Sequence, residues 1–280
     1  MPKIHINLTR LLIITLAAIL VGYLVLVIYV YLNQRKMIYF PQPLDARSLD
    51  AAQATAINFQ DISIAADDGT LLRGWLRTDS TSTPQNLLIY FGGNAEELSY
   101  ELVEIPRLAG WSIALINYRG YGQSGGQPSQ DKLFADALSI YDHFAKRTDI
   151  NKDKIVIMGR SLGTTVATYL ASRRPSCQVI LISPISSMVD VAQSHYPYLP
   201  ASFLMQEKFL AINYAATIKT PLFYIYADQD KVVYPALSQR LAAAWLGAQS
   251  GYLAADQNHN SIMQDPKVWP LIKQHIAQCP

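Results

Sequence analysis

Cysteine is nearly absent from this chain of 280 residues, which contains it only at positions 177 and 279. Two thiols are too few for a disulfide-rich scaffold and for a zinc site built from cysteines. We expect Cys177 and Cys279 to be unpaired, with a single bridge as the alternative if the domain faces an oxidising compartment.

Charge is also scarce. Charged side chains form only 16% of the sequence, and the formal net charge is +2. The first 36 residues hold four basic and no acidic residues, which leaves 19 basic and 21 acidic residues for the remainder. No basic run is long enough to indicate nucleic acid as a partner. Internal repeats and low-complexity tracts are missing as well, so the composition predicts one large or two small globular α/β domains.

A long apolar run lies near the N-terminus. Leu11 to Leu32 is 22 residues without a charge, which as a helix spans about 33 Å, enough for a bilayer core. The run is longer than the apolar region of a cleaved signal peptide and is not followed by a small-residue cleavage site. We therefore predict an uncleaved, single-pass membrane anchor. Two basic residues flank the run on each side, so the charges do not predict which side of the membrane holds the rest of the chain.

The pattern divides the chain into three regions. We predict the anchor over residues 1–36, with its transmembrane helix at about 11–32, a polar connector over 37–56, and one domain over 57–280. Within the connector, residues 37–40 (MIYF) are an apolar patch. This patch either lies in the membrane interface or packs on the domain.

Periodicity predicts the fold of the domain. Residues 57–78 form two strand-like runs around the turn signal at 67–69, which predicts an antiparallel hairpin at a sheet edge. Beyond it, strand and helix patterns alternate, which predicts a mostly parallel sheet with helices on both faces. The expected strands are 87–91, 112–117, 155–158, 179–182, 222–226 and 251–254, and the expected helices are 96–109, 131–147, 161–173, 235–246 and 266–277. Residues 185–219 break the rhythm, and we predict a small lid insertion there with a helix in its SFLMQEKFL segment.

The strongest chemical signal is the pentapeptide Gly159-Arg160-Ser161-Leu162-Gly163, between the apolar strand 155–158 and a helical pattern. A G-x-S-x-G sequence in that context is typical of a nucleophile elbow. Such a turn has no room for side chains two residues before and after the serine, where this chain has glycine. The turn would raise the Ser161 hydroxyl above the sheet, at the N-terminus of the following helix. We predict that Ser161 is a nucleophile.

A serine hydroxyl needs an imidazole base that is held by a carboxylate. Of the five histidines, His259 is the one in a polar loop between the last expected strand and the last expected helix, where functional groups gather in open α/β sheets. The acid is expected in the loop after the preceding strand, which contains Asp228 and Asp230. We select Asp230, because a residue further along that loop can better reach the histidine.

A tetrahedral oxyanion needs two backbone N–H donors. Leu162, directly after the nucleophile, would supply one. The glycine-rich turn after strand 87–91 would supply the other from Asn94, with Ala95 as the alternative. This turn matches neither the G-x-G-x-x-G nor the G-x-x-x-x-G-K phosphate-binding pattern. We expect no metal ion and no cofactor in the site.

With these residues in place, the chain from about 57 to 278 resembles the α/β-hydrolase superfamily. It is most similar to the membrane-anchored branch that includes α/β-hydrolase domain proteins 13 and 17. The matching segments are YFGGNAEE (90–97), INYRGYGQSGGQPS (116–129), GRSLGTTVA (159–167), the lid stretch 183–209 with its Y-P-x-L-P, YADQDKVV (226–233) and QNHNS (257–261).

This resemblance implies that Ser161, Asp230 and His259 form a catalytic triad. The amides of Asn94 and Leu162 would form the oxyanion hole, and residues 118–122 would be structural.

Two positions depart from the family pattern. The family usually has His-Gly-Asn where this chain has Gly92-Gly93-Asn94, and aspartate where this chain has Asn117. Without the histidine we expect a looser turn that still donates its backbone N–H groups. Asn117 should cost at most one structural hydrogen bond.

Taken together, the sequence predicts a membrane-anchored serine hydrolase that cleaves an ester, thioester or amide through an acyl-enzyme. Attachment to a bilayer favours an acylated or lipidic small molecule, or an acylated protein, as the substrate. The alternative is a non-catalytic, membrane-tethered binding scaffold, although such a protein would often lack one member of the triad. A dehalogenase would require a carboxylate in place of Ser161.

Overall fold

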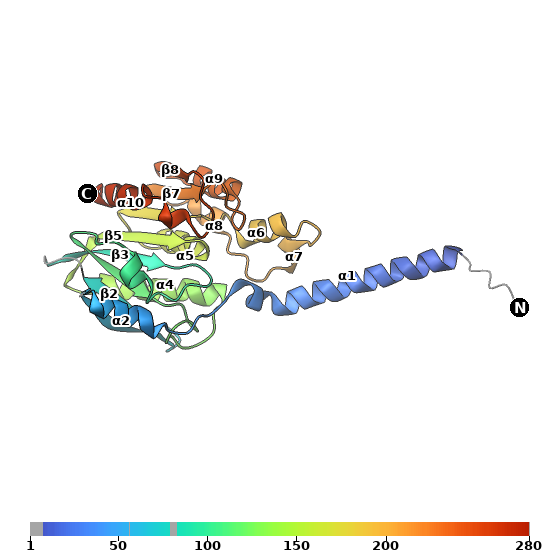
Figure 1. Ribbon diagram of the computed structural model, residues 1–280, viewed down its shortest axis with the longest axis horizontal. Helices are drawn as coiled ribbons and strands as arrows, with labels where there is room; N and C mark the ends of the chain where they lie inside the picture. Colours follow the sequence, from blue (N-terminus) through green and yellow to red (C-terminus); the bar gives the residue numbers. More distant parts are fainter. Residues whose placement is uncertain (1–7, 56, 79–82, 280) are drawn as a thin grey trace, which may run out of the picture.

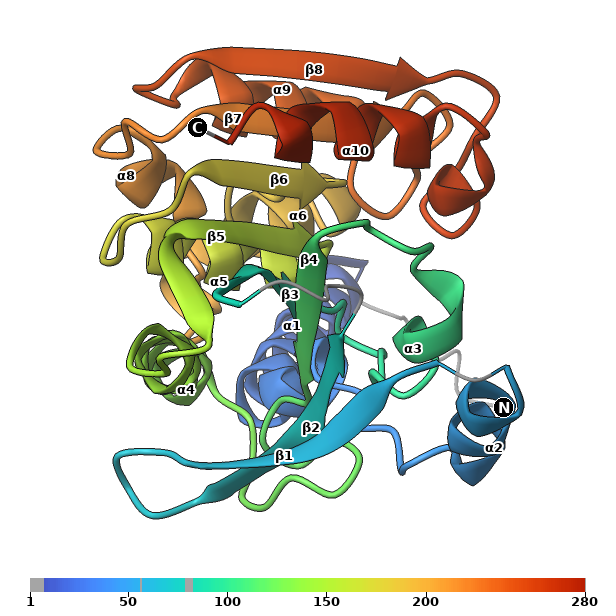
Figure 2. The ribbon, with the colours of Figure 1, turned by 90° about the vertical axis from the view of Figure 1, so that its left-hand side faces the viewer.

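The computed structural model describes residues 8–55, 57–78 and 83–279, and it has one long helix that projects from an α/β domain (Figure 1). The projecting helix is α1 (Leu8–Ile38). The domain is built on an eight-stranded sheet with the strand order β1-β2-β4-β3-β5-β6-β7-β8 (Figure 2).

The hairpin expected at the sheet edge consists of β1 (Phe59–Ala65) and β2 (Leu71–Thr78), and β2 also pairs antiparallel with β4 (Trp111–Ile116). All other pairings of the described strands are parallel. These strands are β3 (Gln85–Phe91), β5 (Ile150–Arg160), β6 (Gln178–Ile182), β7 (Leu222–Ala227) and β8 (Gln249–Ala254).

Helices cover both faces of the sheet, and the strands divide their side chains between two apolar cores. In β3, residues 87, 89 and 91 belong to one core, and residues 88 and 90 belong to the other, as the two-residue period of a strand requires. The first core is completed by α4 (Gln130–Ala145), α5 (Leu162–Ala171), α8 (Ala211–Ala215) and α9 (Pro235–Ala243). The second is completed by α2 (Ala46–Ala54), α3 (Glu101–Glu104), the 3-10 helix η1 (Ile262–Gln264) and α10 (Val268–Ala277). The predicted fold class is confirmed.

The helix expected over 96–109 is wrong for most of its length, because α3 comprises only four residues. Pro106 follows the C-cap Ile105, whose backbone is extended at φ −70° and ψ 119°. A proline disfavours helical geometry in the residue before it, so it ends the helix here.

The lid region contains α6 (Met188–His195), α7 (Ala201–Leu204) and α8. The helix expected in SFLMQEKFL is wrong beyond Leu204. The N–H of Gln206 donates to the side-chain oxygen of Gln34, at 2.7 Å, and the N–H of Phe209 donates to the side chain of Gln130. These amides therefore bond to other parts of the molecule instead of to a helix.

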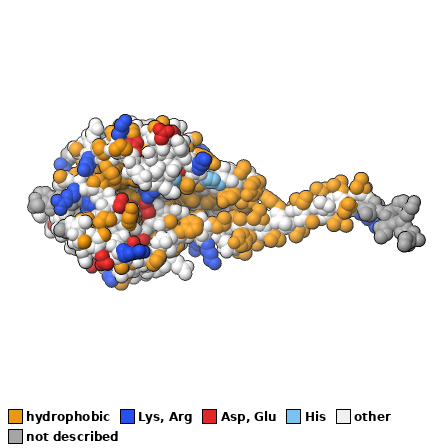
Figure 3. Space-filling model, in the orientation of Figure 1, with side chains coloured by type: hydrophobic (Ala, Val, Ile, Leu, Met, Phe, Trp, Pro, Cys, Tyr) orange, Lys and Arg blue, Asp and Glu red, His pale blue; other side chains and the backbone are white. Residues whose placement is uncertain are grey.

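By length and composition, α1 is a candidate membrane span, and no residue of its most apolar 18-residue window is buried. Hydrophobic side chains cover this helix and continue onto the part of the domain from which it projects (Figure 3). The two basic residues expected before the apolar run are Lys3, which lies outside the described residues, and Arg10.

The segment predicted as a polar connector contains the end of α1, which continues to Ile38, and the helix α2, which begins at Ala46. Of the apolar patch 37–40, Ile38 and Tyr39 are buried in the core of the domain, whereas the other two residues are about half exposed. Packing on the domain thus explains the middle of the patch.

Cys177 and Cys279 form a disulfide, with their Cα atoms 5.3 Å apart. The expectation of two unpaired thiols is wrong. Cys177 directly precedes β6, and Cys279 follows α10, which packs on the same sheet. The parallel sheet brings these two distant parts of the sequence together. A local sequence pattern does not reveal such a contact.

Candidate active site

Ser161 occupies a sharp turn between β5 and α5. Its backbone has φ 51° and ψ −120°, a region that non-glycine residues rarely adopt and that is found where a structure holds strain for function. A Cβ on Gly159 would lie 2.4 Å from the carbonyl oxygen of Gly163, and one on Gly163 would lie 2.0 Å from the carbonyl oxygen of Phe91. Both flanking glycines are therefore required by the close approach of the backbone.

Three side chains that the sequence analysis selected meet at this turn. His259, from the loop after β8, places Nε2 3.0 Å from Ser161 Oγ. Its Nδ1 lies 2.8 Å from Oδ2 of Asp230, in the loop after β7. Ser161 and Asp230 are both buried. The arrangement can accept the serine proton on Nε2 and stabilise the resulting imidazolium from the other side of the ring.

The carboxylate of Asp230 accepts four hydrogen bonds. The N–H groups of Val232 and Val233 donate to Oδ1, each at 2.8 Å, and Ser183 Oγ donates to Oδ2 at 3.1 Å, next to His259. Burial alone would raise the pKa of Asp230, but the hydrogen bond and charge of His259 and the two amides outweigh it and lower the pKa below its ordinary value. Asp230 is therefore held as an anion. Asp228, the other candidate, is exposed.

Leu162 and the turn that carries Asn94 both lie next to the serine. Leu162 begins α5, and the Asn94 turn follows β3, where a Cβ on the adjacent Gly93 would lie 3.6 Å from Ser161 Cβ. Within the described part of the chain, no group accepts a hydrogen bond from the backbone N–H of Asn94 or Leu162. The side chain of Asn94 is already engaged, because Nδ2 donates to the carbonyl oxygen of Ile38 at 3.0 Å. The backbone of Asn94, and not its amide side chain, is thus the part available to a bound substrate.

Comparison with known proteins gives relatives over most of the chain. An α/β-hydrolase fold model matches residues 86–211. The uncharacterized protein Rv2307c of Mycobacterium tuberculosis is 32% identical over 220 residues, which cover 78% of this chain and 77% of that protein. The chain belongs to the α/β-hydrolase family.

Two further relatives of this α/β-hydrolase are eukaryotic. The α/β-hydrolase domain-containing protein WAV2 of Arabidopsis thaliana is 29% identical, with 72% of each chain covered. The uncharacterized membrane protein YNL320W of Saccharomyces cerevisiae is 27% identical, with 89% of this chain and 90% of that protein covered.

Solved structures share the fold. The esterase Pf2001 of Pyrococcus furiosus superimposes with a TM-score of 0.65 at 19% identity, covering 86% of this chain and 98% of that one. Acetyl xylan esterase 1 of Thermoanaerobacterium sp. gives 0.63 at 16% identity, covering 85% and 95%. At these identities the likeness establishes the architecture alone.

The α/β-hydrolase turn at 92–94 is braced without the usual histidine. The N–H of Gly93 donates to the carboxylate of Glu96. The phenol of Tyr118 donates to the carbonyl oxygen of Gly92 at 2.9 Å, and that of Tyr121 donates to the carbonyl oxygen of Asn94 at 2.6 Å. These three hydrogen bonds hold the turn in place, in contrast to the looser turn expected from the missing histidine.

Arg160 joins the two sides of the site. Its guanidinium forms an ion pair with Glu96 and donates to the carbonyl oxygen of His259 at 3.3 Å. Burial opposes the charge of Arg160, but Glu96 outweighs it and raises the pKa of the guanidinium. Arg160 thus contacts both Glu96, which holds the 92–94 turn, and the backbone of His259, the candidate base.

The second departure from the family pattern is also compensated. The side-chain oxygen of Asn117 accepts from the N–H of Leu98 at 2.8 Å, and its NH2 group donates to Glu97 at 2.7 Å. An aspartate could make only the first of these bonds, because an ionised carboxylate donates none.

Sequence reasoning missed Ser183, Glu96 and Arg160. Ser183 follows β6 with φ 49°, and its position after a parallel strand next to the serine strand was the available signal. Glu96 lies inside a segment that matched the family, and Arg160 lies inside the G-x-S-x-G pentapeptide. Among the described residues, no group of three or more histidine, cysteine, aspartate or glutamate side chains is placed to hold a metal ion.

Proposed function

We propose that this α/β-hydrolase is a membrane-anchored serine hydrolase that cleaves an ester, thioester or amide through an acyl-enzyme. The observation that carries the proposal is the continuous hydrogen-bonded line from Ser161 through His259 to Asp230, at 3.0 and 2.8 Å. The four hydrogen bonds on Asp230 and the strained turn at Ser161 support it, because both hold reacting groups in place before a substrate binds.

In the first half of the reaction, Ser161 Oγ attacks the carbonyl carbon of the substrate while His259 Nε2 accepts the hydroxyl proton. The carbonyl oxygen becomes an oxyanion, which the N–H groups of Asn94 and Leu162 stabilise. As the tetrahedral intermediate collapses, the bond to the leaving group breaks and the imidazolium donates its proton to that group. A water molecule, activated by His259, then attacks the acyl-enzyme, and the acid and free Ser161 are released.

Two observations support the membrane part of the proposal. The exposed apolar stretch of α1 is long enough to span a bilayer, and the yeast relative is named as a membrane protein. The full chain should stay with membranes in alkaline carbonate. Arginines in place of Ile19 and Leu20, near the middle of the span, should release it, because each costs about 2.5–3.5 kcal/mol at a helix centre. Release of the unaltered chain by carbonate would contradict the anchor.

The catalytic part is tested with a fluorophosphonate probe and p-nitrophenyl butyrate. We expect the full chain to be labelled and to hydrolyse the ester, and Ser161→Ala and His259→Ala to lose at least about 10³-fold in kcat/KM. Ser172→Ala, a serine at the far end of the same helix, is the matched control and should keep both signals. Undiminished labelling of Ser161→Ala would sink the proposal and would favour a binding scaffold.

A further inference from the structure

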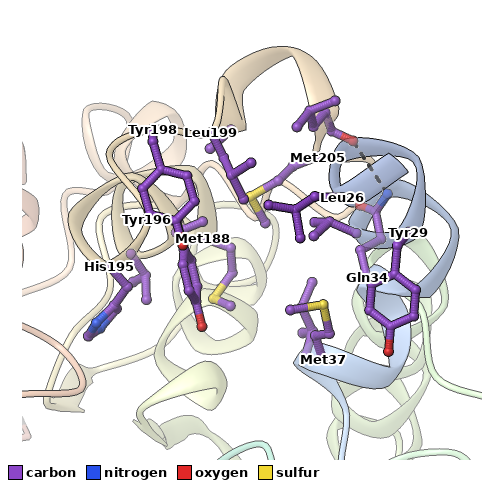
Figure 4. A pocket seen from close by; sticks show the side chains of 16 residues that line it. Leu26, Tyr29, Gln34, Met37, Met188, His195, Tyr196, Tyr198, Leu199 and Met205 are labelled. Atoms are coloured by element: carbon purple, nitrogen blue, oxygen red, sulfur yellow. Dashed lines mark hydrogen bonds between the residues drawn. The ribbon is translucent and has the colours of Figure 1, made fainter. Parts of the chain in front are cut away.

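A cavity of about 310 Å³ lies between α1 and the lid, within the range of ligand-binding pockets. Six of its sixteen lining residues come from α1, and ten come from the segment 188–205. Figure 4 shows Leu26 and Met37 of α1 on one side, and Met188 and Leu199 of the lid on the other. The wall is almost entirely apolar, and thioether side chains adapt well to flexible ligands.

Two polar side chains in the wall, Gln34 and His195, are engaged with the protein. Gln34 Nε2 donates to the carbonyl oxygen of Leu204 at 3.3 Å (Figure 4). Its Oε1 accepts from the N–H of Gln206 at 2.7 Å. His195 Nε2 lies 2.9 Å from the carbonyl oxygen of Val232. These contacts join the walls to each other and to the domain, and they leave an interior suited to a hydrocarbon chain.

We propose that this cavity binds the fatty acyl chain of a bilayer-resident substrate, so that the candidate membrane helix itself forms one wall of the substrate site. The inference rests on the proposed hydrolase function and adds to it the class of acyl group.

Two residues that line the cavity form hydrogen bonds with residues in or next to the candidate active site. Ile38 lines it, and the carbonyl oxygen of Ile38 accepts the side-chain N–H of Asn94 on the oxyanion side. On the other side, His195 contacts Val232, whose N–H donates to Asp230. A chain held between these contacts would lead its carbonyl carbon toward the serine between the two segments.

The position of the lid along α1 identifies the bilayer as the source of the chain. Tyr23 donates its phenol proton to the carbonyl oxygen of Tyr198 at 3.0 Å, and Tyr23 precedes Leu32, the end of the charge-free run, by about 14 Å of helix. The lid tip therefore lies beside the apolar part of the span. Phe203 is 88% exposed at this tip, and Tyr196 and Tyr198 are also exposed, so the tip presents aromatic side chains to its surroundings beside the span. An acyl chain can then enter the cavity without crossing water.

The first test is a chain-length profile, measured with the full chain in phosphatidylcholine nanodiscs and p-nitrophenyl esters of two to sixteen carbons. Ala192 lines the cavity from a partly exposed position on α6, so Ala192→Trp fills it with little risk to the fold. We expect at least tenfold lower kcat/KM for esters of twelve carbons or more and a change within twofold for acetate and butyrate. Ser202→Trp adds the same side chain at an exposed lid position outside the cavity, and should leave the profile unchanged.

The outcomes separate the two proposals. A Ser161-dependent activity whose chain-length profile is the same in wild type and Ala192→Trp overturns the cavity and leaves the hydrolase standing. Parallel assays with 1-palmitoyl lysophosphatidylcholine and an S-palmitoylated peptide in the same nanodiscs identify which substrate carries the chain, and Ala192→Trp should slow whichever is cleaved.

The second test does not depend on turnover. Ser161→Ala in nanodiscs is irradiated with a palmitate that carries a diazirine in mid-chain, and the adducts are located by mass spectrometry. We expect adducts at Met188, Met205 or Leu26 that excess palmitate suppresses and that Ala192→Trp reduces at least fivefold. Adducts confined to the outer face of α1, or unaffected by Ala192→Trp, would refute an acyl site here.

Discussion

The carboxylate of Glu96 stands where a side chain at Gly92 would have to go, because a Cβ on Gly92 would lie 2.7 Å from Glu96 Oε2. Any residue other than glycine at position 92 would therefore clash with Glu96 in its present conformation. The chain thus holds the N–H of Gly93 with a carboxylate that is itself fixed by Arg160.

Glu96 should act as a positioning residue for the turn that carries Asn94. Glu96→Ala removes the acceptor from the N–H of Gly93, and we expect kcat for p-nitrophenyl butyrate to fall about 10- to 100-fold with KM little changed, since a small displacement of an oxyanion donor is costly. Glu96→Gln keeps an oxygen acceptor and should recover most of the loss. Equal damage by both substitutions, together with equal losses in melting temperature, would indicate a structural role only.

The two aspartates after β7 should differ sharply. Asp230→Asn removes the anion that faces His259, and we expect kcat to fall on the order of 10³- to 10⁴-fold. Asp228→Asn changes an exposed residue in the same loop and should stay within twofold. Ser183→Ala removes one of four hydrogen bonds on Asp230 and should cost about tenfold. Steady-state kinetics on the ester would contradict the assignment if Asp228→Asn were the more damaging change.

The sequence could predict the candidate site because each of its parts follows a strand. The order of Ser161, Asp230 and His259 and the glycines around the serine are local features, and a parallel sheet brings loops after neighbouring strands to one edge. Glu96 and Ser183 were missed, because their roles depend on which side chain fills the space left by Gly92 and which one reaches the loop after the neighbouring strand.

The errors in the fold have two different origins. The expected helix at 96–109 ignored the effect of Pro106, which could have been recognised from the sequence. The expected helix in the lid could not have been corrected in this way, because its amides at 206 and 209 bond to Gln34 and Gln130, which are distant in sequence. The disulfide likewise joins residues 102 positions apart.

Stability should depend on pH through Glu101, which lies beside the Arg160–Glu96 pair. Burial, assisted by the charge of Glu96, raises the pKa of Glu101 from 4.5 to about 8. Between these values the folded chain keeps a proton that the unfolded chain releases, so this contribution to stability is complete below pH 4.5 and is lost as the pH rises through 8. We expect the melting temperature of Glu101→Gln, relative to wild type, to increase from pH 5 to pH 9.

Glu104→Gln, at an exposed position on the same short helix, is the control for that experiment. Its melting temperature should follow that of wild type across the range. A constant difference between Glu101→Gln and wild type from pH 5 to pH 9 would show that Glu101 ionises alike in the folded and unfolded chains.

The disulfide leads to two predictions, one for the free energy of unfolding and one for the side of the membrane on which the domain lies. Closing a loop of about 100 residues contributes up to about 4.7 kcal/mol in the chain-entropy model, and losses of 2–5 kcal/mol are usual. We expect Cys177→Ser with Cys279→Ser to lower the free energy of unfolding in urea by an amount in this range. Since such bonds persist in oxidising compartments, the domain should lie on the non-cytosolic side of the membrane.

The redox state of the two cysteines in the cell tests this location. Cells are quenched in acid, and the chain is treated with maleimide-polyethylene glycol, which labels free thiols. We expect a gel shift only after reduction. A shift of two labels without a reductant would show that both thiols are free in the cell. It would contradict the disulfide as evidence for a non-cytosolic domain.

The junction between helix and domain has a consequence for what can be reached. Glu207 accepts hydrogen bonds from Arg35, in the last turn of α1, and from Tyr39, at 2.8 and 2.7 Å, so α1 is fastened to the domain and is not joined to it by a slack linker. An enzyme on a slack tether sweeps a volume around its attachment point. If α1 spans a bilayer and the domain is a hydrolase, as proposed, the site would work at a single height relative to the bilayer plane and would meet its substrates by lateral diffusion. Bonds at that height would be within range, and equally reactive bonds further from the membrane would not.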